Sequence, residues 1–293
     1  QPTAKVVAAT VPTVAVVTWP SITGTPTVDA AVVADGGRWS PADVRLSYQW
    51  AVGGKPVKGA TRSSYTPTAG DLGKSLTVTV TAARSGYAAA SVVTAAKKVV
   101  AGAPPRSVKP PTISGKAKVG SRLTAKPGTW SPSSVRTSFQ WLANGKSIKG
   151  ATKSTYTPRT TDVGKKLSVR VTATRAGHRT AVATSKATVA VPKVAPKVRA
   201  KLSRTTASTS SRVVVTVTVT ATGVKAPTGV VTVRYGSKSV KAKVTSSKHG
   251  KVTVTLPRLR KGSYAVTATF APSGSTGKVV SSAKAKAGTL RIR

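Results

Sequence analysis

The sequence predicts an all-β protein made of three tandem β-sandwiches joined by short linkers that contain proline. Three observations support this fold class: a tandem repeat, a strand-like alternation of apolar and polar residues, and the lack of helical periodicity in every stretch. The chain has 293 residues and a mass of 29.8 kDa, which is too long for one ordinary core and long enough for two or three small ones.

The repeat consists of motifs that recur at a constant offset of 91 residues. Trp39-Ser-Pro41 recurs as Trp130-Ser-Pro132, and Gln49-Trp50 recurs as Gln140-Trp141. Two further motif pairs keep the same offset: Tyr65-Thr-Pro67 with Tyr156-Thr-Pro158, and Asp71-x-Gly73-Lys74 with Asp162-x-Gly164-Lys165. No gap is needed in the alignment, so we infer a tandem duplication.

Within each copy, apolar residues recur with a period of two. Val44, Leu46, Tyr48 and Trp50 alternate with polar residues, and so do the valines and threonines after Leu76. This pattern, rich in β-branched residues, is typical of half-buried strands. Gly53-Gly54 and Asn144-Gly145 follow the tryptophan strands, and both pairs tolerate the positive φ angles of a type I′ hairpin turn. We therefore expect about seven short strands per copy, as in a sandwich.

The last third of the chain lacks the tryptophan motifs but keeps the strand pattern. Apolar and polar residues alternate over 213–220, 230–235, 251–256 and 264–270, with a turn expected at Pro227-Thr-Gly229. This region is expected to form a third sandwich of a different subtype.

These observations predict the following order along the chain. Residues 1–19 are expected to be a linker or the terminal strand of a preceding repeat, because residues 4–9 resemble 97–101. The predicted sandwiches and the linkers between them are 20–102, 103–110 (linker), 111–190, 191–200 (linker) and 201–293. Because both linkers contain proline and are short, we expect a semi-rigid rod.

The composition provides few residues that could act as acids, bases or nucleophiles in catalysis. The chain has no Cys, no Met and no Glu, which excludes a disulfide scaffold, a thiolate metal site and a cysteine nucleophile. Asp71 and Asp162 occupy equivalent repeat positions and are interpreted as turn caps. The remaining aspartates match no known metal loop, His178 is interpreted as a surface substitution, and His249 as a turn residue. We expect no enzyme activity, no cofactor and no metal.

The charge is the strongest functional signal in the sequence. The chain has 48 Lys and Arg against five Asp, which gives a net charge of +43. Residues 1–105 carry a net +6, whereas residues 106–200 carry +19 and residues 201–293 carry +18. Surface charge of one sign attracts polyanions, although it also serves simply to keep a protein soluble.

Three clusters are candidates for polyanion contact. The second-sandwich cluster is Lys116, Lys118, Arg122 and Lys126; the strand cluster is Lys238, Lys241 and Lys243; the loop cluster is Arg258, Arg260 and Lys261. Sequence-specific reading of nucleic acid is not expected, because recognition helices and stacking aromatics are missing. Trp39 and Trp130 are candidates for stacking on sugars, and the alternative is that they cover the end of each sandwich.

The repeat motifs, including Trp-Ser-Pro, Tyr/Phe-Gln-Trp and Asp-x-Gly-Lys, resemble an immunoglobulin-like repeat of exported Gram-positive bacterial proteins. The resemblance covers about residues 20–190 and departs from the pattern at Val28-Asp29. Residues 201–290 are similar to a second bacterial immunoglobulin-like repeat through Pro227-x-Gly229 and Gly262-Ser-Tyr264. The resemblance implies that Trp50 and Trp141 take the core position of strand C, without the disulfide that often packs there.

The resemblance and the charge together predict a secreted or cell-surface bacterial protein. Since the sequence contains no apolar run of 18 residues, we expect no transmembrane segment. Its expected role is that of a non-enzymatic structural or adhesion rod that associates with anionic polymers: teichoic acid, acidic polysaccharide or extracellular DNA, without sequence specificity. Copies of itself or a larger surface assembly are further candidate partners. The alternative is a dedicated carbohydrate- or DNA-binding accessory module of a larger secreted protein.

Overall fold

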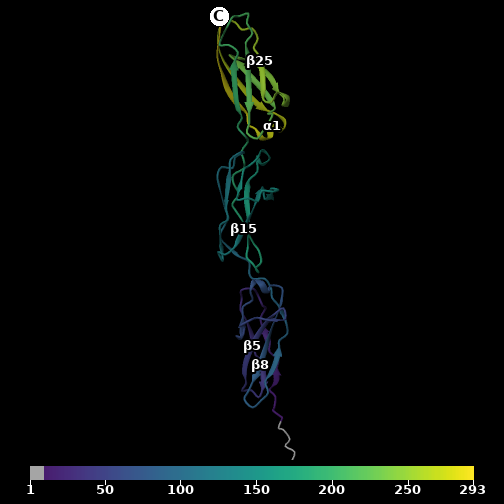
Figure 1. Ribbon diagram of the computed structural model, residues 1–293. Coiled ribbons are helices and arrows are strands. Elements are labelled where there is room, and N and C mark those ends of the chain that lie inside the picture. Colours follow the sequence, from purple (N-terminus) through teal and green to yellow (C-terminus); the bar gives the residue numbers. More distant parts are fainter. Residues whose placement is uncertain (1–9) are drawn as a thin grey trace, which may run out of the picture. The chain divides into compact units, whose positions relative to one another are not determined.

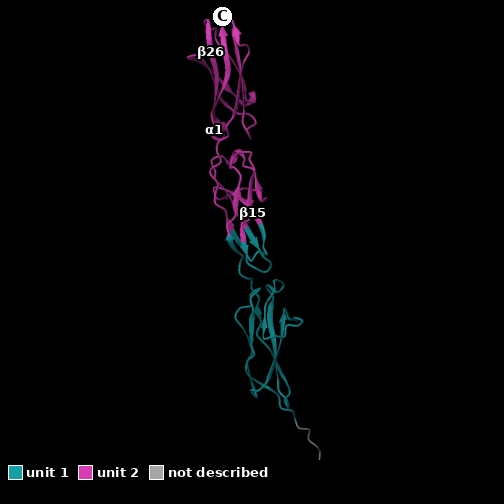
Figure 2. Ribbon diagram, turned by 90° about the vertical axis from the view of Figure 1, so that its left-hand side faces the viewer, with its two compact units in different colours: residues 1–108, 130–137, 172–182 teal, residues 109–129, 138–171, 183–293 magenta. Residues whose placement is uncertain are grey.

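The computed structural model describes residues 10–293 and is almost entirely β-structure (Figure 1). The chain divides into two compact units, one of residues 1–108, 130–137 and 172–182, the other of residues 109–129, 138–171 and 183–293 (Figure 2). The buried apolar side chains of residues 10–293 form three clusters, at 14–99, 117–194 and 202–292. The fold is therefore a tandem array of β-sandwiches, as the sequence predicts.

The first sandwich consists of short antiparallel strands around a core that contains Trp50. Its strands are β1 (Ala15–Thr18), β2 (Ser21–Thr23), β3 (Val32–Asp35), β4 (Arg38–Ser40), β5 (Arg45–Val52), β6 (Lys55–Pro56), β7 (Ser64–Tyr65), β8 (Ser75–Ala83), β9 (Ala90–Val93) and β10 (Lys97–Lys98). One sheet has the order β2-β3-β7; in the other, β8 pairs with β5, β9 and β10, and β5 also pairs with β6. The alternating residues of β8 place Leu76, Val78 and Val80 in the core.

The second sequence repeat forms the counterparts of β1 to β9 in the same order, and among the described residues it has no counterpart of β10. They are β11 (Arg106–Lys109), β12 (Thr112–Ser114), β13 (Leu123–Lys126), β14 (Thr129–Ser131), β15 (Arg136–Ala143), β16 (Lys146–Ser147), β17 (Thr155–Tyr156), β18 (Leu167–Thr174) and β19 (Ala181–Thr184). The sheets have the orders β12-β13-β17 and β16-β15-β18-β19. The predicted hairpin turns are confirmed, because Gly53, Gly54, Asn144 and Gly145 all have positive φ angles between 47° and 79°.

The third sandwich has longer strands and a different topology. Its elements are β20 (Lys197–Leu202), β21 (Thr206–Ala207), β22 (Val214–Thr220), β23 (Gly229–Tyr235), β24 (Lys238–Val244), β25 (Lys251–Thr255), β26 (Gly262–Pro272), α1 (Gly274–Val279) and β27 (Ala283–Ile292). A sheet of order β20-β22-β25 faces a sheet of order β21-β27-β26-β23-β24. Between them lie Phe270 and the inward-facing valines of β22 and β23, all completely buried: Val215, Val217, Val219, Val231 and Val233.

Several of these elements differ from the sequence prediction. Strands β11 and β20 lie wholly or partly in segments that were expected to be linkers, and β1 lies in the segment expected to be a linker or the terminal strand of a preceding repeat. Each pairs with a strand of the sandwich that follows it, namely β14, β22 and β4. The predicted terminal strand at residues 4–9 lies outside the described residues. The short helix α1 was not predicted, since its six residues include two glycines and show no amphipathic period.

Candidate anion-binding surface

The paired aspartates of the repeat are turn caps, as predicted. Asp71 Oδ2 accepts hydrogen bonds from the Thr68 N–H at 2.8 Å and the Tyr65 hydroxyl at 2.9 Å. Asp162 Oδ2 accepts the equivalent bonds from the Arg159 N–H at 2.8 Å and the Tyr156 hydroxyl at 2.7 Å. Each aspartate thereby closes a 3₁₀ turn, η1 (Ala69–Asp71) or η2 (Thr160–Asp162), before the long strand of its repeat.

These bonds contribute to shifts in the pKa of Asp71, Tyr65 and Tyr156. Partial burial would raise the pKa of Asp71, but the Thr68 N–H, the hydroxyls of Tyr65 and Thr68 and the charge of Lys74 together lower it. Burial and the hydrogen bond to Asp71 raise the pKa of Tyr65 to about 12. Burial and the bond to Asp162 likewise raise the pKa of Tyr156. The lowered pKa of Asp71 favours the ionised carboxylate, which acts here as a hydrogen-bond acceptor.

The other three aspartates each have a separate partner. Asp43 pairs with Arg84 at 2.7 Å, and Asp35 accepts a hydrogen bond from the Gly37 N–H at 3.1 Å. Asp29 pairs with Arg175 at 2.7 Å, a contact inside the first compact unit. Within residues 10–293, no three acidic or histidine side chains gather in a group that could hold a metal ion.

His178 is not the surface residue that the sequence suggested. Its side chain is 7% exposed and lies 3.4 Å from Asp29 Oδ2, and its Nε2 lies 3.0 Å from Arg175 Nη1. The imidazole is buried because Gly102 has no side chain: a Cβ there would lie 2.6 Å from the ring. His249 is a turn residue, as expected, with a φ of 45° at the end of η3 (Ser246–Lys248).

Trp39 and Trp130 are 5% and 7% exposed, and the Trp39 indole N–H donates to the Gly36 carbonyl at 2.9 Å. Stacking on a sugar needs an open ring face, which the two residues do not offer in this conformation. Their burial instead favours the alternative that they cover the sandwich. Trp19 is 70% exposed and has Pro110 as its counterpart in the second repeat, so sequence reasoning passed over the one tryptophan of residues 10–293 with an open surface.

The predicted cationic clusters are exposed, but they differ in how closely their members are arranged. In the second-sandwich cluster, Arg122 and Lys126 lie on outward positions at and just before β13, whereas Lys116 and Lys118 lie in the turn after β12. In the strand cluster, Lys241 and Lys243 alternate with inward-facing residues of β24. The loop cluster occupies the connection from β25 to β26, where the Arg260 carbonyl accepts a hydrogen bond from the Tyr264 hydroxyl at 2.9 Å.

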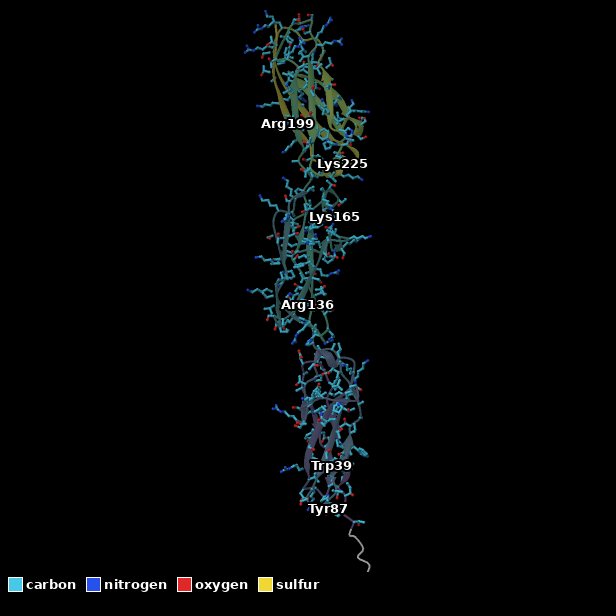
Figure 3. The ribbon with its side chains drawn as sticks, viewed as in Figure 1. Trp39, Tyr87, Arg136, Lys165, Arg199 and Lys225 are labelled. Atoms are coloured by element: carbon cyan, nitrogen blue, oxygen red, sulfur yellow. The ribbon has the colours of Figure 1, made fainter. Side chains whose placement is uncertain are left out.

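The structure also brings together cations that are distant in sequence. On the outer face of the β20-β22-β25 sheet, Arg199 lies opposite Thr218, and Thr218 lies opposite Lys251. Lys201 lies two residues further along β20, opposite Thr216. Figure 3 labels Arg199 on this sandwich, from which nitrogen-tipped side chains project. Sequence reasoning missed this set because its members come from different strands, and only the strand register places them side by side.

No family model matches the chain, and no curated protein matches it. The chain is similar in structure to a Ca²⁺-stabilized adhesin that helps an Antarctic bacterium reach out and bind ice, at 15% identity and a TM-score of 0.31 over 97% of this chain and 74% of that one. It is also similar to an ICAM-5 D1–D4 ectodomain fragment (16% identity, TM-score 0.37, 94% and 76% covered). A third similar structure is that of the chicken CNTN1 FN1–FN3 domains, at 13% identity and a TM-score of 0.21 over 93% of this chain and 97% of that one.

No helix among the described residues is long and apolar enough to cross a membrane. The fold assignment rests on the strand order of the chain itself. The protein is an all-β array of tandem β-sandwiches, each around its own buried apolar cluster.

Proposed function

We propose that this protein is a non-enzymatic, extracellular structural or adhesion rod of bacterial origin whose second and third sandwiches associate electrostatically with anionic polymers. One observation carries the proposal: residues 163–293 contain 27 Lys and Arg and no acidic side chain. A surface that needed charge only for solubility would tolerate both signs. One-sign charge at this density creates a positive potential that concentrates polyanions.

The placement of the charges supports the same proposal. Lys241, Lys243, Arg258, Arg260 and Lys261 are all exposed, so their charges face solvent rather than internal partners. In the part of the chain that the structure describes, no ion pair joins a cation of the third sandwich to a carboxylate side chain. The positive field there is consequently not cancelled locally.

A salt titration tests this function. The full chain is titrated with duplex DNA, teichoic acid and an acidic polysaccharide at several salt concentrations, with a neutral glycan as control. We expect binding to each polyanion at low salt and a linear fall of log K with log salt, with a slope of about −0.9 for each phosphate neutralised on duplex DNA. Absence of binding to every polyanion at low salt would contradict the proposal and leave a spacer role.

A dedicated carbohydrate-binding accessory module is the second candidate, because Trp19 exposes 70% of its surface. An exposed indole can stack on the apolar face of a sugar. This candidate predicts retention on a neutral glycan at high salt and loss of that retention in Trp19→Ala. Binding that disappears at high salt in the wild-type chain would exclude it.

A further inference from the structure

We infer that the third sandwich has a built groove for a linear phosphodiester polymer, which we call the β20 groove. This inference rests on the proposed function and names one binding site for the anionic polymer. The groove has a volume of about 710 Å³, and four cations line it: Arg199 and Lys201 from β20, Lys251 from β25 and Lys286 from β27. None of these four residues belongs to the clusters that the sequence suggested.

The strand register fixes the spacing of three of these cations, Arg199, Lys201 and Lys251. Arg199 and Lys201 are two residues apart on one strand, so their Cα atoms are separated by about 6.6 Å. Arg199 and Lys251 flank Thr218 across two strand spacings, which is about 9.6 Å. The hydroxyl-bearing Thr216 and Thr218 lie between the two cationic sides. The groove thus presents several positive charges at intervals of about 6.6 and 9.6 Å, and a polymer with regularly spaced anions could contact more than one of them.

The four head groups are available for a ligand. Within residues 10–293, none of them has a hydrogen bond or an ion pair to another side chain, and the sandwich from residue 201 onward contains no Asp or Glu. An arginine fork and lysine ammonium groups are both good phosphate donors, and threonine hydroxyls add neutral donors. The chemistry of the lining therefore fits phosphate.

The shape and the remaining lining select the class of polymer. The groove is open along the sandwich surface, so a chain can enter and leave it. Val198, Ala200 and Ala285 supply apolar wall that suits the carbon linkers between phosphates. No aromatic side chain lines the groove, so it has no platform on which nucleic-acid bases could stack. The ligand class is accordingly a base-free phosphodiester chain, for which poly(glycerol phosphate) is a suitable probe.

Two charge-matched variants of the full chain test the groove. The groove variant is Arg199→Gln, Lys201→Gln, Lys251→Gln and Lys286→Gln. The scattered variant also removes one Arg and three Lys from exposed positions of the same sandwich: Arg212→Gln, Lys225→Gln, Lys248→Gln and Lys278→Gln. Since both lower the net charge equally, a difference between them reports on position and not on total charge. Unchanged thermal unfolding confirms that each variant is folded.

For poly(glycerol phosphate), we expect the groove variant to bind about tenfold more weakly than wild type, with a salt slope shallower by about 2 to 3, since each single-strand phosphate contact contributes about 0.7. The scattered variant should stay close to wild type. Equal losses in both variants would overturn the groove while leaving general polyanion attraction intact. No binding by the wild-type chain at low salt would overturn the groove and the proposed function together.

Lysine acetylation gives a second, site-resolved measurement on the wild-type chain. With the polymer present, Lys201, Lys251 and Lys286 should lose most of their acetylation rate, while Lys225, Lys248 and Lys278 keep theirs. Uniform protection, or protection of the second set alone, would contradict the assignment. Tighter binding of oligo(dT) than of poly(glycerol phosphate) at equal charge would overturn the base-free ligand class.

Discussion

The first and second sandwiches share the same internal frame and differ in the surface around it. Trp50 and Trp141 are both fully buried, and each indole N–H donates at 2.9 Å to a carbonyl twelve residues later. Each tryptophan also lies 5.6 Å, between ring centroids, from Tyr65 or Tyr156. Yet residues 1–105 carry a net +6 and residues 106–200 a net +19. A small set of inward side chains therefore suffices for the fold, and the outward positions are free to acquire charge.

One aligned arginine shows how the surface can change while a contact is kept. Arg84 pairs with Asp43 of its own repeat at 2.7 Å and lies 5.0 Å from the centroid of the Tyr87 ring. Arg175, the residue at the same repeat position, has Ser134 in place of that aspartate and pairs with Asp29 instead. Arg175 thus also has a carboxylate partner, but that aspartate lies in a different segment of the first compact unit.

The largest effect expected within this comparison comes from removing the central tryptophan of either repeat. Trp50→Ala and Trp141→Ala should each cost about 3–5 kcal/mol, because each leaves a cavity in a fully packed core. Calorimetry should show the affected sandwich unfolding more than about 10 °C lower, while the transition of the other repeat stays in place. Trp→Phe at the same site is the control and should cost less. Equal lowering of both transitions by either change would show that the two sandwiches do not unfold independently.

The frame could be predicted from the sequence because its signals are local. The alternation around Trp50, the Gly53-Gly54 turn and the Asp71 cap each depend on residues close together in the chain, where side-chain period and turn chemistry decide the outcome. The duplication strengthened each assignment by showing it twice.

The remaining features depend on contacts between distant segments. The burial of His178 requires the close approach of Gly102, and β21 exists because Thr206 and Ala207 pair in parallel with the end of β27. The β20 groove gathers residues from 199 to 286, and the alternation within any one strand does not reveal which strands are neighbours. Counting charges along the sequence consequently identified the third sandwich as cationic. It could group only cations that are close together in the chain, so it missed the groove.

A smaller effect is expected at the turn caps. Asp71→Ala and Asp162→Ala each leave a tyrosine hydroxyl and a backbone N–H without their acceptor, at a cost of about 1–3 kcal/mol. The loss should be larger at Asp162, which is 3% exposed, because water reaches Asp71 more easily. Urea unfolding followed by tryptophan fluorescence measures both, since the third sandwich contains no Trp. In a double-mutant cycle with Tyr156→Phe, additive losses would contradict the coupling that the 2.7 Å bond implies.

The smallest effect is a loss of stability at alkaline pH in both repeats. Since folding raises the pKa of Tyr65 from 10.0 to about 12, the neutral phenol is favoured in the folded state. That contribution is complete below pH 10 and is lost as the pH rises toward 12; the raised pKa of Tyr156 has the same sign. Lysine deprotonation in the same range relieves repulsion among the 48 Lys and Arg and opposes the loss.

Comparison with Tyr65→Phe and Tyr156→Phe separates the two alkaline effects, because these variants keep every lysine. Urea midpoints are measured between pH 9 and pH 11 for the wild type and both variants. The stability advantage of the wild-type tyrosine should shrink as the pH rises, in each repeat separately. A constant advantage across this range would contradict the prediction, because it would mean that the pKa of each tyrosine is the same in the folded and unfolded states.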